Sequence, residues 1–163
     1  LQQYVLILAN SGIRAGEARY LEWSDISNTK TLSGDTRIVL FVEGKTGARE
    51  VVCNETMGRY LSRLYDFRKD ELGDIPDQSE YIFSHRNGNP IKSLRKSFNT
   101  LMDNSGLAYN NKGQRRVIYS LRHTYATMRL QVGVSIFQLA SNMGTSVEMI
   151  ERYYGKKKTQ CFY

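Results

Sequence analysis

Residues 119–155 read YSLRHTYATMRLQVGVSIFQLASNMGTSVEMIERYYG, and this stretch does most to decide the fold. Ser120 is a typical residue to cap the start of a helix, and Gly133 is a typical residue to end it. Ser135 and Gly144 bracket a second helix in the same way. A third helix follows and runs to the pair of tyrosines near the end of the chain. The pattern predicts three consecutive helices joined by short connections.

The part of the chain before this stretch mixes the helical and the extended periodicities. Near-helical spacing of apolar residues predicts helices over 2–10 and 15–22. β-Branched and apolar runs predict strands over 37–43 and 49–53. Two glycines flank the short segment between the strands, so we expect a β-hairpin with a tight turn.

Further helices complete the pattern. One is predicted from a cap at Asn54 to about Leu72, and a basic amphipathic one over 92–104. A polar loop is expected over 108–116. The order is helices, one small antiparallel sheet, then helices, so we predict a mainly α fold with a small antiparallel β-hairpin. A length of 163 residues fits a single domain.

The charge balance favours a polyanionic partner. The chain has 23 Lys and Arg against 16 Asp and Glu, for a formal net charge of +7. A field of this sign attracts nucleic acid first and acidic membrane surfaces second. No apolar run reaches the roughly 18 residues that a membrane span needs. The apolar start, LQQYVLILANSG, lacks the basic region and cleavage site of a signal peptide, so we expect a core helix in a cytoplasmic protein.

Four residues are candidates for chemistry. Arg14 lies in a turn between two predicted helices, and Arg122 lies in the first turn of another. An arginine so placed can offer two parallel donors to a phosphate. Lys45 lies at the hairpin tip, and Tyr154 lies beside Tyr153 near the end of the chain. Taken singly, each also has an ordinary explanation: a surface salt bridge, a solvated lysine or a packed tyrosine.

Together these residues form a pattern that resembles the tyrosine recombinases, the phage integrase family. SGIRAGEARYLEWSDI is similar to the family's first signature and supplies Arg14, Glu17, Leu21, Trp23, Asp25 and Ile26. The stretch from residue 119 is similar to the second signature and supplies Leu121, Arg122, His123, Thr124, Ala126, Thr127 and Gly133. Lys45 in EGKTG matches the family's hairpin lysine. The resemblance spans essentially the whole chain, and it implies the catalytic-domain fold of these enzymes.

The resemblance also implies a reaction. Counted from Arg122 with the family's spacing, the nucleophile is Tyr154 rather than Tyr153. Its hydroxyl would attack a DNA phosphodiester to leave a 3′-phosphotyrosine and a free 5′-hydroxyl. Arg14 and Arg122 would stabilise the charge on the phosphorus oxygens, and Lys45 would give a proton to the departing oxygen. No metal ion and no cofactor is expected.

The sequence departs from the family pattern at two positions. Tyr119 stands where the family has a histidine, and Thr145 stands where it has a histidine or tryptophan. Both keep a hydroxyl that can bond a phosphate oxygen, but neither has an imidazole to accept a proton. Supporting roles are expected for His123 and Glu17 as well, and acid–base work is expected from Lys45 and water.

The resemblance implies double-stranded DNA as the partner and site-specific recombination, of the kind that integrates phage or mobile elements, as the function. The candidate DNA contacts are Lys92, Arg95 and Lys96 on the amphipathic helix and Arg115 and Arg116 in the loop. We expect a homotetramer on DNA and a monomer or weak dimer in its absence. We also expect a fragment of a longer bacterial or phage integrase, without its N-terminal DNA-binding domain. Two alternatives stay open: a DNA-binding module of this fold that has lost catalysis, and an enzyme like the type IB topoisomerases.

Overall fold

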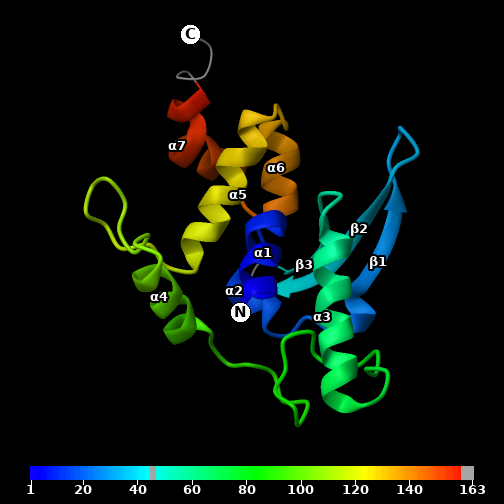
Figure 1. The fold of residues 1–163 in the computed structure, drawn as a ribbon. Coiled ribbons are helices and arrows are strands. Elements are labelled where there is room, and N and C mark those ends of the chain that lie inside the picture. The colour runs from blue at the N-terminus through cyan, green and yellow to red at the C-terminus, as the bar shows by residue number, and fades with distance from the viewer. Residues whose placement is uncertain (45–46, 159–163) are drawn as a thin grey trace.

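The computed structural model describes residues 1–44 and 47–158, and Figure 1 shows their arrangement. Within this part of the chain, helices surround a single three-stranded sheet. The helices are α1 (Gln2–Ser11), α2 (Ala15–Ala18), α3 (Met57–Leu72), α4 (Arg95–Asn104), α5 (Tyr119–Gln131), α6 (Ile136–Met143) and α7 (Val147–Lys158). The strands are β1 (Ile26–Lys30), β2 (Thr36–Gly44) and β3 (Gly47–Val52). The predicted fold class, mainly α with a small antiparallel sheet, is confirmed.

The sheet is antiparallel, with the strands in the order β1-β2-β3. Gly44 pairs with Gly47, so β2 and β3 form the predicted hairpin. Strand β1 was not predicted, because it has one apolar residue, Ile26, ahead of four exposed polar positions. Ile26 pairs with Leu40 of β2. An edge strand can rely on its hydrogen bonds to one neighbour and needs no apolar alternation.

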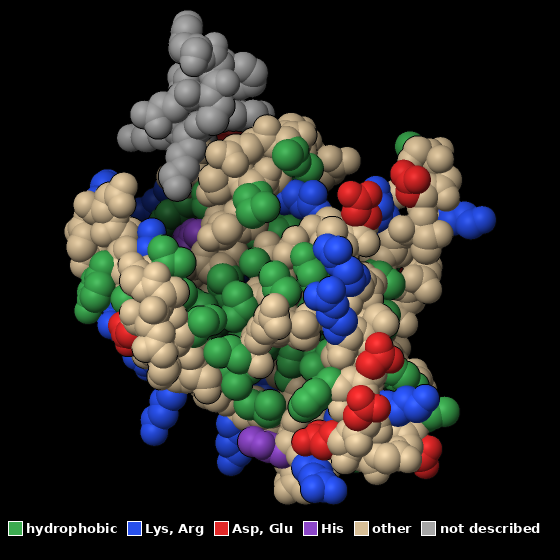
Figure 2. Space-filling view, viewed as in Figure 1, with side chains coloured by type: hydrophobic (Ala, Val, Ile, Leu, Met, Phe, Trp, Pro, Cys, Tyr) green, Lys and Arg blue, Asp and Glu red, His purple; other side chains and the backbone are tan. Residues whose placement is uncertain are grey.

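Two hydrophobic cores hold the elements together. The first lies between α1, the sheet and α3, and it includes Ile7, Leu40, Val51 and Met57. The second lies between α5, α6 and α7, and it includes Ala126, Leu139, Met143, Ile150 and Tyr154. Figure 2 shows apolar side chains gathered over the middle of one face, where α1 lies between α5 and α3. The two cores therefore meet along α1 and α5, which pack against each other.

Several helix boundaries differ from the predictions. Helix α5 begins at Tyr119, and Ser120 lies inside it, where its hydroxyl accepts from the backbone of Val117. Helix α3 begins at Met57 rather than at an Asn54 cap. Helix α4 begins at Arg95, so Lys92 is not on it. Ser135 does cap α6, where its Oγ accepts from Gln138 N at 3.2 Å.

Helix α7 is also longer than predicted. It was expected to end at Tyr154, but it continues through Gly155 to Lys158. Gly155 lowers helix stability by about 1 kcal/mol relative to alanine but does not forbid a helix. Tyr154 is therefore held by helical backbone on both sides. None of the helices in the described part of the chain has the length and apolar character that crossing a membrane requires.

Gly12 sets how closely α1 approaches α5. It ends α1 with a φ of 70°, in the left-handed region, and its N–H donates to Leu8 O at 3.0 Å. A Cβ atom added at Gly12 would lie 2.3 Å from the ring of Tyr125 on α5. Both the backbone conformation and the close contact therefore require glycine at this position.

We predict that Gly12→Ala destabilises the fold far more than Gly34→Ala. Gly34 has a φ of 88° but open space where a Cβ would be, so alanine there costs about 1–2 kcal/mol of backbone strain. Gly12→Ala adds the cost of displacing Tyr125, about 1–3 kcal/mol more. Urea unfolding of the two variants measures the difference. Equal losses would show that α1 and α5 do not depend on this contact.

Candidate active site

The candidate site lies in the seam, which is the boundary where the two hydrophobic cores meet along α1 and α5. Three arginine side chains cross this seam to backbone oxygens on the other side. Arg14 Nη2 donates to Gly144 O at 2.8 Å, and Arg49 Nε donates to Asn142 O at 3.1 Å. Arg122 crosses in the opposite direction, from α5 to the carbonyl of Gly12. The seam is therefore lined by guanidinium groups that come from both halves of the chain.

Glu17 is the anion that holds two of these arginines. Its Oε1 accepts from Nη1 of Arg14 and from Nη1 of Arg49, both at 2.8 Å. Its Oε2 accepts from Arg14 N at 2.7 Å and from Arg49 Nη2 at 2.9 Å. The carboxylate is 2% exposed. Burial raises the pKa of Glu17, but the hydrogen bonds from Arg49 and Arg14 outweigh burial and bring the pKa to about 2.

Two glycines make room for this cluster. A Cβ at Gly44, the last residue of β2, would lie 2.8 Å from Oε1 of Glu17. A Cβ at Gly144, which follows α6, would lie 2.8 Å from the guanidinium of Arg49. The hairpin and the α6–α7 connection therefore both approach Glu17 and its arginines through glycine backbone. Lys45, the predicted proton donor of the hairpin, lies outside the described residues.

Arg122 is buried and fixed. Its side chain donates to Gly12 O and to Met143 O, and the residue is 4% exposed. Burial lowers the pKa of the Arg122 guanidinium, and the positive charge of Arg14 lowers it further. Met143 and Gly144 are consecutive, so Arg122 and Arg14 hold neighbouring carbonyl oxygens. The two guanidinium groups therefore lie near one another.

Tyr154 faces the same seam from α7. The residue is 6% exposed, and its hydroxyl shares a hydrogen bond with Nδ1 of His123 at 2.5 Å. Burial raises the pKa of Tyr154 to about 12, and the nearby phenol of Tyr119 adds to the increase while Arg122 opposes it. Tyr153 is its neighbour in sequence but is largely exposed. The structure therefore distinguishes the two tyrosines by burial and by contact.

The two positions that depart from the family pattern lie at the edges of this group. Tyr119 is the first residue of α5, is exposed, and places its ring edge-on to His123 with centroids 5.0 Å apart. Thr145 is half-buried in the connection after Gly144, and its N–H donates to Ala140 O at 3.0 Å. Arg14, Glu17, Tyr119, His123, Arg122, Thr145 and Tyr154 thus lie on the elements around the seam, and their roles stay predictions.

The expected DNA-binding residues do not form one cluster. Arg115 Nη2 donates to both carboxylate oxygens of Asp103, at 2.8 and 3.0 Å. Arg116 donates to the carbonyls of Leu107 and Tyr109. These two arginines therefore hold the shape of loop 108–116.

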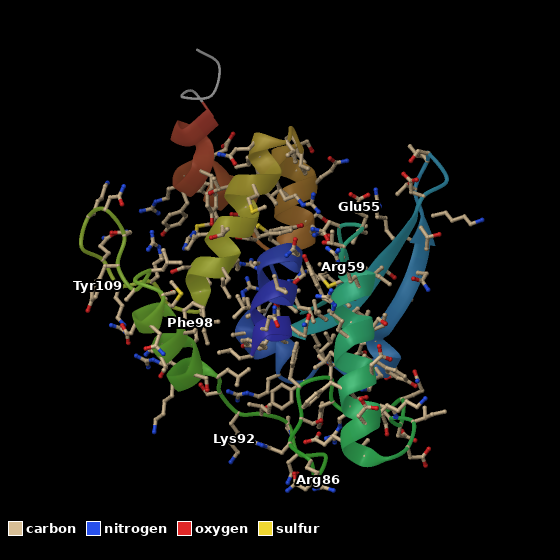
Figure 3. The ribbon with its side chains drawn as sticks, in the orientation of Figure 1. Glu55, Arg59, Arg86, Lys92, Phe98 and Tyr109 are labelled. Carbon is tan, nitrogen blue, oxygen red and sulfur yellow. The ribbon has the colours of Figure 1, made fainter. Side chains whose placement is uncertain are left out.

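The other three candidates lie on or before α4. Arg95 and Lys96 are exposed in its first turn. Figure 3 shows Lys92 on the connection that leads to α4, at the end of the molecule away from α7. The backbone oxygen of Lys92 accepts from Arg19, just after α2, whereas loop 108–116 leads directly into α5.

Sequence reasoning missed Arg49. It lies on β3 on the same face as the buried Val51, two residues away, so the alternation of the strand places it toward the interior. A charged residue in such a position requires a buried partner, and that requirement was the available signal.

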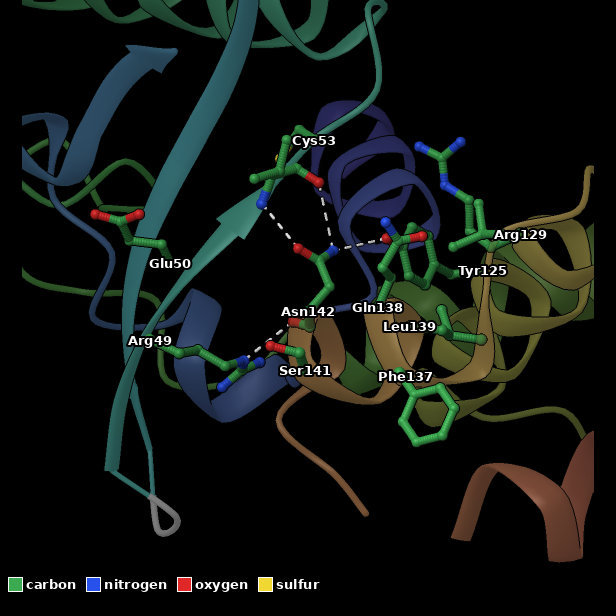
Figure 4. A pocket seen from close by; sticks show the side chains of 12 residues that line it. Arg49, Glu50, Cys53, Tyr125, Arg129, Phe137, Gln138, Leu139, Ser141 and Asn142 are labelled. Atoms are coloured by element: carbon green, nitrogen blue, oxygen red, sulfur yellow. Dashed lines mark hydrogen bonds between the residues drawn. The ribbon is translucent and has the colours of Figure 1, made fainter. Parts of the chain in front are cut away.

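Asn142 is a second residue that was missed. Its side chain accepts from Val52 N at 2.8 Å and donates to Tyr125 Oη at 2.8 Å, as Figure 4 shows. These bonds join α6 to β3 and α5.

Among the described residues, no three His, Cys, Asp or Glu side chains lie close enough to hold a metal ion.

Comparison with known proteins identifies the family of this chain. The chain matches the phage integrase family over residues 1–160. It belongs to that family. No curated protein sequence matched.

Solved structures of recombinases share the fold. The XerA recombinase is 22% identical with a TM-score of 0.70, and the match covers 98% of this chain and 58% of that one. The XerH site-specific recombinase bound to difH substrate, a pre-cleavage complex, is 18% identical with a TM-score of 0.70, covering 98% and 45%. A lambda integrase(75–356) dimer bound to a COC' core site is 19% identical with a TM-score of 0.66, covering 93% and 50%. This chain therefore spans about half the length of these relatives.

We predict that Glu17→Gln destabilises the fold and flattens its dependence on acid pH. The folded pKa of about 2, against an ordinary value of 4.5, corresponds to about 3 kcal/mol of stability. Because the pKa is lowered in the folded state, this contribution is complete above pH 4.5 and is lost as the pH falls toward 2. Urea unfolding from pH 7 to pH 2 measures it in the parent and the variant.

The matched control is Glu50→Gln, an exposed glutamate on β3 next to Arg49. It should leave stability nearly unchanged, because exposed charges contribute little. If the free energy of unfolding fell equally with acid pH in the parent and in Glu17→Gln, the Glu17 ion pairs would not stabilise the fold.

Proposed function

We propose that this chain is the catalytic domain of a site-specific recombinase that breaks and rejoins DNA through a 3′-phosphotyrosine on Tyr154. The observation that carries the proposal is the meeting of Arg14, Arg122 and Tyr154 at one seam. Two guanidinium groups beside a buried phenol form a site for a phosphodiester and its attacking group. Membership of the phage integrase family supports the same activity.

The arginines suit the transition state of such a reaction. A guanidinium has five N–H donors, and the two carbonyl bonds of Arg122 account for two of them. Arg14 and Arg122 can therefore remain anchored while they donate to the non-bridging oxygens of a phosphate. Anchored donors need little reorganisation as negative charge grows, which is the main source of electrostatic catalysis.

Four residues would carry the remaining steps: Tyr154, Lys45, Tyr119 and Thr145. Tyr154 Oη attacks phosphorus and the bond to the 5′-oxygen breaks, so the phosphoester is kept on the enzyme. Lys45 gives the proton to the departing 5′-oxygen. Tyr119 and Thr145 donate their hydroxyls to phosphate oxygens. Rejoining is the reverse: a 5′-hydroxyl attacks the phosphotyrosine.

Double-stranded DNA is the proposed partner, and a homotetramer is the proposed assembly on it. A net charge of +7 favours binding to the phosphate backbone. The XerH and lambda integrase structures contain DNA, which supports the same partner here. Arg95 and Lys96 are the exposed cations that we propose contact phosphates. The cytoplasm of a bacterium, where its DNA substrate is found, is the proposed site of action.

We predict that Tyr154→Phe abolishes the covalent protein–DNA adduct and that Tyr153→Phe retains it. The two tyrosines are adjacent, but one helical step turns a side chain by about 100°, so only one can face the arginines. The measurement is adduct formation by the full-length protein on a nicked substrate, followed by peptide mapping of the modified tyrosine. Phosphotyrosine at residue 153 would contradict the assignment. No adduct from the parent would favour a DNA-binding module that has lost catalysis.

A further inference from the structure

The hydrogen bond between His123 and Tyr154 joins the proposed nucleophile to an imidazole. Nδ1 of His123 and Oη of Tyr154 are 2.5 Å apart. The same imidazole has the ring of Tyr119 edge-on to it and the ring of Tyr153 tilted against it, with centroids 5.0 and 6.4 Å away. Three tyrosine rings therefore surround the imidazole.

We propose that His123 is a catalytic residue, which accepts the proton of Tyr154 Oη as the tyrosine attacks DNA. This inference rests on the proposed function, because it takes Tyr154 as the nucleophile. It replaces the expectation that acid–base work falls on Lys45 and water alone. His123 was expected to have a supporting role, and its contact with the attacking oxygen assigns it a direct one.

Tyr154 needs such a partner. With a pKa of about 12, roughly one molecule in 10⁵ has an ionised phenol at pH 7. The residue is 6% exposed, so bulk water has little access to its proton. A general base within hydrogen-bond distance removes the proton during attack and avoids the cost of a free phenolate.

The imidazole also borders an open hollow. His123 lines a hollow of about 630 Å³ between loop 108–116 and α5, whose other lining residues include Gln114, Ser120, Thr124 and Thr127. The hollow leaves the imidazole position accessible to a small molecule such as free imidazole.

Charged and titratable groups face His123 from its own helix, from loop 108–116 and from α7. Arg122 precedes it on α5, Arg115 and Arg116 line the hollow from the loop, and Tyr119 and Tyr153 face its ring. The neutral imidazole is the form that can accept a proton.

The proton count balances over the cycle. In the neutral tautomer with its hydrogen on Nε2, His123 Nδ1 takes the proton of Tyr154 Oη while the Oη–P bond forms. The P–O5′ bond breaks, and Lys45 supplies the proton to the 5′-oxygen. In rejoining, a 5′-hydroxyl attacks phosphorus and gives its proton back to Lys45, the Oη–P bond breaks, and the tyrosine regains its proton from the imidazolium.

The test is chemical rescue of His123→Ala in the full-length protein. Single-turnover adduct formation on a nicked substrate should fall on the order of 100-fold or more, the usual contribution of a general base. Added imidazole should restore much of the rate, in proportion to its unprotonated fraction. The control variant is Thr124→Ala. Thr124 lines the same hollow, and among the described residues the structure gives it no contact with Tyr154 Oη. This variant should keep the parental rate with and without imidazole.

Three results would overturn the inference. The first is an unchanged rate in His123→Ala. The second is a lower rate that imidazole does not restore although thermal unfolding matches the parent, which would make His123 a positioning residue. The third is a parent protein that forms no adduct, and this result alone would overturn the proposed function as well.

Discussion

The carboxylate of Glu17 is the interaction on which the rest of the site depends. It is almost fully buried, and burial of a charge is costly unless partners replace its water. Arg14 and Arg49 are those partners, and each also reaches across to the end of α6. One carboxylate thus ties together the turn after α1, the hairpin and the α6–α7 connection. The folded protein therefore fixes the positions of these arginine side chains before any ligand binds.

The seam between the two cores explains why the site is at this position. Each core is apolar, and the polar groups that join the two lie at their boundary. Arg14, Arg49 and Arg122 lie on that boundary and donate to carbonyls of the opposite half. Fixed donors in a place of low solvent access interact more strongly with an anion than donors in water do. The same contacts that assemble the fold therefore prepare the phosphate site that we propose.

Much of this arrangement was predictable from the sequence. Periodicity and the Ser and Gly boundary residues indicated the helices α5 and α6, and the hairpin followed from β-branched runs around two glycines. The motifs around Arg14 and Arg122 indicated the family, which the comparisons confirm. The roles of the site residues stay predictions. Strand β1 was missed because its stability comes from pairing with β2 rather than from its own apolar residues.

The contacts between distant residues were beyond the sequence. Arg49 had the signal of an inward-facing charge, but nothing local names Glu17 as its partner. The bond from His123 to Tyr154 depends on how α7 packs on α5, which is a tertiary property. Arg115 and Arg116 were predicted to contact DNA because they are consecutive cations in a polar loop, and that role stays a prediction. Their partners, Asp103 and two backbone carbonyls, are visible only in three dimensions.

The central claim is that Arg14, which Glu17 holds in place, and Arg122 together receive the DNA phosphate. A crystal structure of the full-length Tyr154→Phe protein bound to its DNA substrate tests this claim most directly. The account predicts one phosphate within hydrogen-bond distance of both Arg14 and Arg122, with the Glu17 carboxylate still bonded to Arg14 and Arg49. A DNA complex in which the phosphates lie elsewhere and the seam holds none, or in which Glu17 has released both arginines, would contradict it.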